Sequence, residues 1–189
     1  MKNIIIQDPA KGKIKYVIND AMEIDDFNKK LEMASKNFKM QKNAEIIKDT
    51  NKASGYCYIN KSDHWDKNKQ GFVYTITFND KIVKIGMTEK TISSRFSSYQ
   101  AGTLKARTKG TCSVTNYYCS ESIRQALNEG MKVDIYSYNI PTHYIDADVI
   151  GKNTSIIAKQ AYAYEDRLLE IYKNNKGEVP SLCRNTSLA

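Results

Sequence analysis

Two neighbouring β-strands joined by a tight turn are the strongest local constraint in this sequence. Phe72–Phe78 is a run of β-branched and aromatic residues, and Lys81–Gly86 follows it as a second run of the same kind. Between them, Asn79 and Asp80 form a two-residue turn signal of the type that joins antiparallel strands. The sequence therefore predicts a β-hairpin at this position.

A short helix is predicted directly after the hairpin. Over Thr91–Gln100, the apolar residues Ile92, Phe96 and Tyr99 recur at helical spacing, and Arg95 lies among the polar residues between them. The result is a strand–turn–strand–helix unit.

The later part of the chain continues with alternating helices and strands. Its periodicity predicts a helix over Ser120–Glu129, a core strand over Met131–Tyr138 and a long last helix over Ser155–Lys173. The last helix has an apolar stripe formed by Ile157, Ala161, Tyr164, Leu168 and Ile171.

Residues 1–70 form a separate N-terminal elaboration. We expect short strands at Ile4–Ile6 and Ile14–Ile18, a lysine-rich helix over Asp25–Lys48 and a polar linker over Asn60–Gln70. The buried stripe of the helix is predicted to be Phe27, Leu31, Ala34 and Phe38. We expect residues 71–189 to form the main domain.

The composition is that of an ordinary globular protein. A chain of 189 residues with 41% hydrophobic and 26% charged residues is long enough to bury a core, and this composition argues against disorder and against fibrous structure. No apolar run reaches the roughly 20 residues that span a bilayer, and no signal peptide is recognisable, so we expect a cytoplasmic protein without a membrane partner.

The cysteines and the net charge narrow the possible partners. Cys57, Cys112, Cys119 and Cys183 form no CxxC pair, which favours buried free thiols over a zinc site or disulfides. The net charge of +8 favours a polyanionic partner such as DNA, although a genome-wide bias toward lysine and asparagine explains it equally well.

Four residues have side chains suited to phosphodiester hydrolysis. Tyr74 and Lys84 lie near one another across the predicted hairpin, where a lysine charge lowers the cost of forming a phenolate that acts as general base. Arg95 offers a planar set of donors to a phosphate that gains charge. Glu165, on the last helix, offers oxygen ligands to Mg²⁺ or Mn²⁺. Each of these residue types alone is more often a packing or surface residue.

The stretch from Gly71 to Thr103 resembles the catalytic motif of the GIY-YIG endonuclease superfamily. Gly71-Phe72-Val73-Tyr74 stands in place of GIY and Lys84-Ile85-Gly86 in place of YIG. The sequence looks most like the branch of small type II restriction endonucleases in which a lysine replaces the second motif tyrosine. The resemblance covers about residues 71–185 and implies an α/β (α+β) fold with a three-stranded antiparallel sheet flanked by helices.

The same resemblance implies roles for individual residues. Tyr74 activates water with the help of Lys84, Arg95 binds the scissile phosphate, and Glu165 holds one divalent metal per active site. Tyr99, one helical turn after Arg95, matches a position that contacts the phosphate.

The match to the family is incomplete at several positions. Asn185 is a candidate for the late family asparagine, and Met87 replaces a histidine found in some relatives of this branch. The two histidines, His64 and His143, lie outside the motif and are predicted to be structural or surface residues.

A basic stretch after the motif is the candidate DNA-binding segment. It combines cationic and polar residues of the kind that contact phosphates and base edges, and its alternative interpretation is a solvated loop. Its candidate residues are Lys105, Arg107, Lys109, Ser113, Thr115 and Asn116. The N-terminal lysine-rich helix is predicted to be scaffold, a dimerisation surface or a non-specific DNA contact, in that order.

The expected function is cleavage of both strands of double-stranded DNA at a specific site. A restriction enzyme that cuts a symmetric site is expected to be a homodimer, because a two-fold protein matches a two-fold sequence. The alternatives are a homing or repair nuclease of the same superfamily, and a catalytically inactive DNA-binding module.

Overall fold

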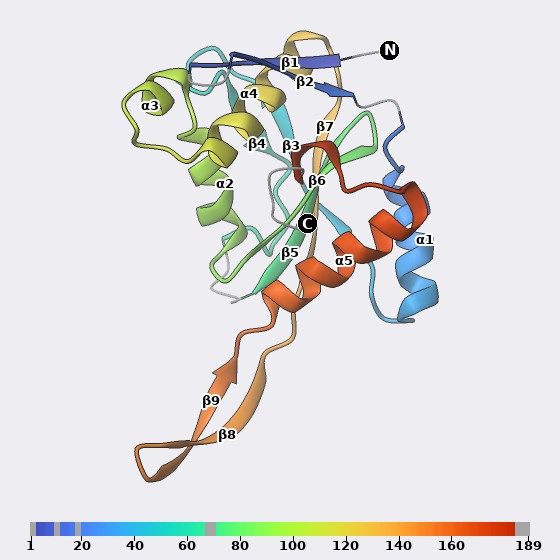
Figure 1. Cartoon of the computed structure of the whole chain (residues 1–189), viewed down its shortest axis with the longest axis vertical. Helices are drawn as coiled ribbons and strands as arrows, with labels where there is room; N and C mark the ends of the chain where they lie inside the picture. The colour runs from blue at the N-terminus through green and yellow to red at the C-terminus, as the bar shows by residue number, and fades with distance from the viewer. Residues whose placement is uncertain (1–2, 10–11, 18–19, 67–70, 184–189) are drawn as a thin grey trace.

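The centre of the molecule is a five-stranded antiparallel sheet with the strand order β4-β3-β7-β5-β6 (Figure 1). The computed structural model describes residues 3–9, 12–17, 20–66 and 71–183. The sheet consists of β3 (Gln41–Lys48), β4 (Tyr56–Ile59), β5 (Phe72–Phe78), β6 (Lys81–Thr88) and β7 (Val133–Asn139). The mixed α+β class expected from the sequence is confirmed.

The predicted hairpin is formed by β5 and β6. At the turn, Asn79 and Asp80 have φ angles of 47° and 64°, the left-handed backbone that Asn and Asp tolerate better than most residues. β7, the third expected strand, pairs with β5 along its whole length. The three strands predicted for the core are therefore neighbours in the order β7-β5-β6.

The region before residue 70 contributes two further strands to this sheet. β3 pairs with β7 on one side and β4 on the other. The helix predicted over Asp25–Lys48 is wrong in its second half, because α1 ends at Ala34 and the chain resumes as β3. Ala44 and Ile46, two residues apart, are both buried in β3, which is the spacing of a strand.

The remaining N-terminal elements agree more closely with the sequence. β1 (Asn3–Asp8) and β2 (Gly12–Val17) form a small hairpin. On α1 (Ile24–Ala34), the predicted stripe residues Phe27 and Leu31 are buried, whereas Ala34 is exposed. The elaboration is therefore part hairpin, part helix and part central sheet.

Helices cover both faces of the sheet. α2 (Ile92–Gln100) and α4 (Val114–Asn128) pack on the face that carries Phe72, Tyr74 and Ile76, while α1 and α5 (Ala161–Lys176) pack on the face that carries Val73 (Figure 1). This follows from the alternation of side chains along β5. β5 is buried over its whole length and carries side chains into both core clusters.

Two helix starts differ from the predictions. α4 begins at Val114 instead of near Ser120, because the Ser113 side chain caps its first turn by accepting a hydrogen bond from the Asn116 amide. A short helix, α3 (Leu104–Thr108), forms within the basic stretch and is capped by Thr103. In both helices, a serine or threonine caps the first turn, in a part of the chain for which a solvated loop was the alternative interpretation.

The last predicted helix is wrong at its start. Residues before Ala161 form a second hairpin, β8 (His143–Val149) and β9 (Lys152–Ala158), which projects from the body of the molecule (Figure 1). Ile157, expected in the buried stripe, is 45% exposed on β9. Its β-branched neighbours favour a strand, and the turn at Ile150 and Gly151 joins it to β8.

Two features complete the fold. A single 3₁₀ turn, η1 (Ser181–Cys183), follows α5 and lies against β6. Among the described helices, none combines the length and the apolarity required to cross a bilayer.

Candidate active site

Tyr74 lies on β5, in the middle of the sheet, with its side chain fully buried. Its cross-strand partner on β6 is Gly86, where a Cβ atom would lie 2.5 Å from the Tyr74 hydroxyl oxygen. Only a glycine leaves room for the phenol to lie across the neighbouring strand. Gly86 therefore determines where the Tyr74 side chain lies.

Arg95 and Tyr99 meet Tyr74 in one hydrogen-bonded cluster. Arg95 Nε donates to the Tyr74 hydroxyl at 2.9 Å, and Arg95 Nη2 donates to the Tyr99 hydroxyl at 3.0 Å. The two hydroxyl oxygens are 2.7 Å apart, and the guanidinium also lies 4.5 Å from the centre of the Tyr99 ring. Both partners of Tyr74 lie on helix α2, one turn apart. Thr91 caps the start of this helix by accepting a hydrogen bond from the Ser94 amide.

Lys84 lies on the same face of the hairpin as Tyr74. It pairs with Ile76, two residues along β5 from Tyr74, so the two side chains are diagonal neighbours. Its ammonium is buried and donates to the Leu182 carbonyl at 3.4 Å. The sequence had predicted proximity of the two residues, and the register gives this diagonal arrangement.

Glu165 approaches the cluster from α5. Its carboxylate is half-buried, within electrostatic reach of Lys84 and Arg95, and Asp166 is its neighbour. Within the described residues, no hydrogen bond or ion pair engages this carboxylate. Residues from two strands and two helices therefore converge on one site.

Burial dominates the electrostatics of the phenols. It raises the pKa of Tyr74 above its usual value, while the charges of Arg95 and Lys84 act in the opposite direction. Lys84 therefore acts on the phenol in the direction expected from the sequence. Desolvation of the buried ring is nevertheless the larger effect, so the pKa of the Tyr74 phenol is raised overall in this conformation.

The two charged partners respond to burial in different ways. Burial raises the pKa of the Glu165 carboxyl, against the opposing influence of Lys84. Burial lowers the pKa of the Lys84 ammonium, but nearby thiols, Tyr74 and Glu165 outweigh it and leave this pKa above its usual value. Lys84 is therefore held in its charged form.

Among the described residues, the site offers few protein ligands to a divalent metal. No group of three or more His, Cys, Asp or Glu side chains with metal-binding geometry occurs in the described part of the chain. Mg²⁺ is commonly held by one or two carboxylates, with water and substrate phosphates as its other ligands. A half-buried Glu165 that forms no hydrogen bond or ion pair with the described residues fits this mode of binding, in which the substrate completes the site.

The predicted DNA-binding residues lie on α3 and at the start of α4. Lys105 and Lys109 are exposed, and Arg107 is half-buried. Ser113 caps α4, and Thr115 and Asn116 lie in its first turn, half-buried. The carbonyl of Asn116 lies where a Cβ at Gly102 would be, at 2.4 Å, so α4 packs directly on the end of α2. The basic segment is thereby joined to the helix that carries Arg95.

Several participants were missed by the sequence analysis. Leu182 and Cys183 reach the site from the C-terminal turn, where Cys183 Sγ accepts from the Ile85 amide at 3.2 Å. Both residues are far from the motif in the sequence, so no local pattern indicated that they would contact Lys84 and Ile85. All four cysteines are free as expected, but only Cys119 and Cys183 are buried. Asn185 lies outside the described residues.

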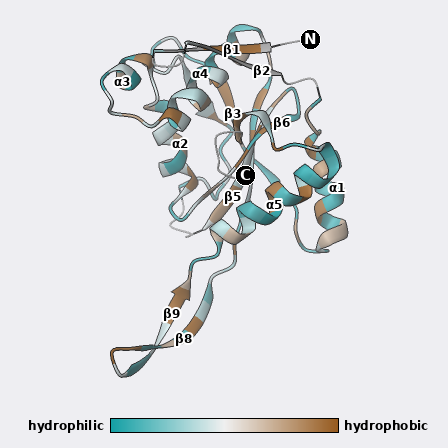
Figure 2. Cartoon of the chain, in the orientation of Figure 1, coloured by the Kyte–Doolittle hydropathy of each residue, from teal (hydrophilic) through white to brown (hydrophobic). Residues whose placement is uncertain are grey.

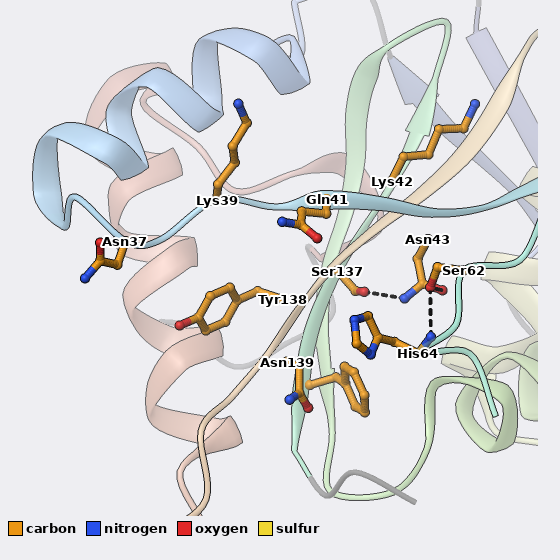
Figure 3. Close-up of a pocket in the computed structure, with 11 residues that line it drawn as sticks. Asn37, Lys39, Gln41, Lys42, Asn43, Ser62, His64, Ser137, Tyr138 and Asn139 are labelled. Carbon is orange, nitrogen blue, oxygen red and sulfur yellow. Dashed lines mark hydrogen bonds between the residues drawn. The ribbon is translucent and has the colours of Figure 1, made fainter. Parts of the chain in front are cut away.

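A polar pocket of about 210 Å³ lies elsewhere, between β3, β7 and the loop that contains His64 (Figure 3). Asn43 links its sides, since its amide nitrogen donates to Ser137 (Figure 3) and its oxygen accepts from Ser62. Ser137 is the cross-strand partner of Tyr74 on β7. The pocket contains none of the predicted catalytic residues. His64 is half-buried in its wall and His143 is exposed on β8, both consistent with structural or surface positions.

The comparisons with known proteins give relatives by fold. No family model and no curated protein matches the sequence. The solved structure of restriction endonuclease HPY188I in complex with product DNA is similar over 89% of this chain and 90% of that chain, with 24% identity and a TM-score of 0.57. A mutant of bacteriophage T4 EndoII is similar over 78% of this chain and 96% of that chain, with 22% identity and a TM-score of 0.53. The chain therefore shares the fold of these two proteins over most of its length.

Proposed function

We propose that this protein is a sequence-specific endonuclease of the GIY-YIG type that hydrolyses phosphodiester bonds in both strands of DNA. The observation that carries the proposal is the cluster in which Arg95 donates to both Tyr74 and Tyr99. A guanidinium that donates to two buried phenols holds both hydroxyl oxygens in fixed positions. Catalysis requires such fixed positions, whereas packing of the two rings does not. The fold shared with a restriction endonuclease solved with its product DNA supports the same reading.

Tyr74 is the general base in this proposal. Arginine donates only, so each phenol oxygen accepts from Arg95, and one hydroxyl hydrogen serves the 2.7 Å contact between Tyr74 and Tyr99. With Tyr99 as the donor, a Tyr74 phenolate accepts two hydrogen bonds and lies near the charge of Lys84. These interactions offset part of the cost that burial imposes on the phenolate.

Arg95 has a second role as the phosphate ligand. Tyr74 has no exposed surface, so DNA reaches it only when the cluster opens. A phosphate competes for the guanidinium with a stronger, charge-assisted hydrogen bond than a neutral phenol offers. Binding of the scissile phosphate would therefore draw Arg95 Nη2 away from Tyr99 and toward the substrate, which opens the cluster beside the Tyr74 hydroxyl, while Arg95 Nε keeps its hydrogen bond to that hydroxyl.

Glu165 is the proposed ligand of one Mg²⁺ or Mn²⁺. When bound, the metal would stabilise negative charge on the leaving 3′ oxygen. The raised pKa of its carboxyl, which is due to burial, favours Glu165 as a group that gains from a nearby cation. The products would be a 5′ phosphate and a 3′ hydroxyl.

The proposed DNA contacts are the six residues of α3 and the start of α4. The exposed Lys105 and Lys109 are suited to phosphates, whereas the polar side chains at the start of α4 are suited to base edges. A homodimer would match a symmetric cleavage site. A homing or repair nuclease of the same superfamily remains the closest alternative, and an inactive DNA-binding module is the alternative outside enzymes.

A cleavage assay tests the proposal. Purified protein is incubated with plasmid DNA and Mg²⁺, beside the variants Tyr74→Phe and Glu165→Gln. We expect discrete, metal-dependent fragments from the wild type and a loss of at least about 100-fold in both variants. Tyr162→Phe and Glu170→Gln are the matched controls, since both lie on the exposed side of α5, and we expect wild-type rates from them.

The outcomes separate the alternatives. Nicking or smearing without discrete fragments would favour a less specific nuclease of the superfamily. DNA binding without cleavage at any metal concentration would favour the inactive module. Full activity in Tyr74→Phe, with the fold intact by circular dichroism, would exclude Tyr74 as the base.

A further inference from the structure

The hairpin β8–β9 carries exposed apolar side chains that nothing in the described chain covers, most of them on one face, with Tyr144 and Ile157 paired on the other. In its register, Ile145 pairs with Ile156 and Ala147 pairs with Thr154, and paired residues point to the same face. Ile145, Ile156 and Val149 on this face are 50%, 38% and 45% exposed. Figure 2 shows hydrophobic colour along a hairpin that projects from the body.

A hairpin with these exposures is not a stable unit by itself. Two strands alone are at best marginally stable in water, and independent stability needs a third layer or a packed face. Exposed β-branched residues at this density also favour aggregation unless they are covered. The hairpin therefore requires a partner surface.

The turn at the tip of the hairpin also carries an exposed apolar side chain. Ile150 is fully exposed and adopts a φ of 55° in the turn before Gly151. The left-handed backbone costs an ordinary residue about 1–2 kcal/mol, and asparagine or glycine would avoid most of this cost. An isoleucine at this position is destabilising in the free chain, which suggests that its side chain contributes to an interface.

Charge argues against DNA as that partner. Asp146 and Asp148 lie on the opposite face of the hairpin, and Lys152 is the one basic residue of its two strands. The hairpin is therefore slightly acidic in a chain with a net charge of +8. Carboxylates beside an apolar tip would repel a phosphate backbone and would favour the basic body of another protein molecule.

The base of the same hairpin offers a complementary site. An apolar groove of about 290 Å³ lies between α1 and α5, where the chain enters and leaves the hairpin. Its floor is an aromatic stack in which the rings of Phe38 and Tyr138 are 4.1 Å apart and Tyr164 follows. Arg167 lies on its rim.

We infer that β8–β9 is a dimerisation arm, which reaches across to a second copy of this chain so that the two copies form a dimer. Around a two-fold axis, the apolar faces of two hairpins pack on each other, and the tip of each reaches the base of the other. Ile150 then meets the partner's aromatic groove, and Asp148 lies near Arg167 on its rim, where it would share this guanidinium with Glu170.

The dimensions allow this arrangement. Each seven-residue strand is about 24 Å long, so an antiparallel pair of arms spans the distance from tip to base. Two arms and two grooves contribute to every dimer. A stable interface needs about 800 Å² from each partner, to which one arm and one groove of each chain would contribute.

Sedimentation velocity of the full chain without DNA tests the inference. We expect a dimer for the wild type at micromolar concentration. Ile156→Asp on the apolar face should raise the dimer dissociation constant by at least about 100-fold, because each dimer would bury two unpaired charges. The matched control is Ser155→Asp, which places the same charge one residue away on the opposite face and should leave the dimer intact.

A second variant separates the interface from the fold. Ile150→Asn relieves the backbone strain of the turn, so the melting temperature of the monomer should not fall, while the dimer dissociation constant should rise several-fold. A monomeric wild type at 100-fold higher concentration, or a dimer insensitive to Ile156→Asp, would overturn the inference. So would an Ile150→Asn variant whose dimer is unchanged but whose DNA affinity is lost. None of the sedimentation results depends on nuclease activity, so this inference and the proposed function fail separately.

Discussion

Gly86 determines where the Tyr74 hydroxyl lies. A Cβ at this position would be 2.5 Å from the hydroxyl oxygen and 2.6 Å from the ring carbon that bears it. Both atoms belong to a ring buried on all sides, so the ring can move only by disturbing its neighbours. The precise position of the proposed base thus depends on one missing methyl group.

We expect Gly86→Ala to lower cleavage activity by at least about 100-fold, because a displacement of about 1 Å is enough to remove a reacting group from its proper geometry. Stability should fall by about 1–3 kcal/mol, as for other overpacked cores. Plasmid cleavage and urea unfolding measure the two effects. Wild-type activity in a folded Gly86→Ala protein would mean that Tyr74 can move without consequence and is not the base.

The local part of this site follows from short-range patterns in the sequence. Tyr74, Lys84 and Arg95 lie on a hairpin and on the helix that follows it, so short-range patterns were sufficient to bring them together. The direct bond between Tyr74 and Tyr99 could not be predicted, because it depends on how α2 packs on the sheet. The net effect of burial on the phenol likewise required the complete core.

Strand β6 is an edge of the central sheet, and the C-terminal turn covers part of it. The Ile85 amide donates to Cys183 Sγ, and Cys183 Sγ donates to the Ile85 carbonyl, both at 3.2 Å. The thiol therefore takes the place of a neighbouring strand at this residue, and burial raises its pKa to about 11, so it remains protonated and able to donate. The same turn brings the Leu182 carbonyl to Lys84.

We expect Cys183→Ala to destabilise the protein by about 1–3 kcal/mol, because it leaves buried backbone groups of β6 without partners. Cys183→Ser keeps a donor and an acceptor and should lose less. Urea unfolding of the two variants measures the difference. Equal losses would show that the thiol contributes by packing volume and not by its hydrogen bonds.

At the level of elements, errors in the sequence analysis have a common cause. Residues 41–48 and 155–158 were included in predicted helices, although the predicted apolar stripe of the first helix ended at Phe38 and that of the second contained only Ile157 from this segment. β3 is a strand because it lies between β4 and β7, and β9 is a strand because it pairs with β8. Whether such a short segment forms a helix or a strand depends on the strand with which it can pair. The periodicity of its own residues does not contain this information.

The charge of the whole molecule should govern its affinity for DNA. With a net charge of +8, binding should weaken steeply with salt, since each phosphate neutralised contributes a slope of about −0.9 in log affinity against log salt. We expect Lys105→Ala on α3 to reduce the magnitude of this slope by about 1. Fluorescence anisotropy with a labelled duplex at several salt concentrations measures it.

Lys173→Ala is the control, since it removes the same charge from the far end of α5, where the residue is exposed. Its slope should match that of the wild type. An equal reduction in both variants would mean that net charge, and not α3, determines the affinity.

At the level of the whole molecule, the class of the fold was predictable and its full sheet was not. Local patterns indicated strands β5, β6 and β7 and the helices around them. The order of the sheet depends on pairing between β3 and β7, which are far apart in the sequence, and no local pattern specifies such a partner.

The position of β3 also has a consequence during synthesis. β3 is made early, yet its partner β7 leaves the ribosome only after the whole hairpin β5–β6 and helices α2 to α4. At about 5–20 residues per second, the N-terminal strands wait for seconds with an open edge. Glu165 and the turn that holds Lys84 come later still. The complete set of proposed catalytic groups is thus present only after α5 and η1 have been made, well after Tyr74 and Arg95.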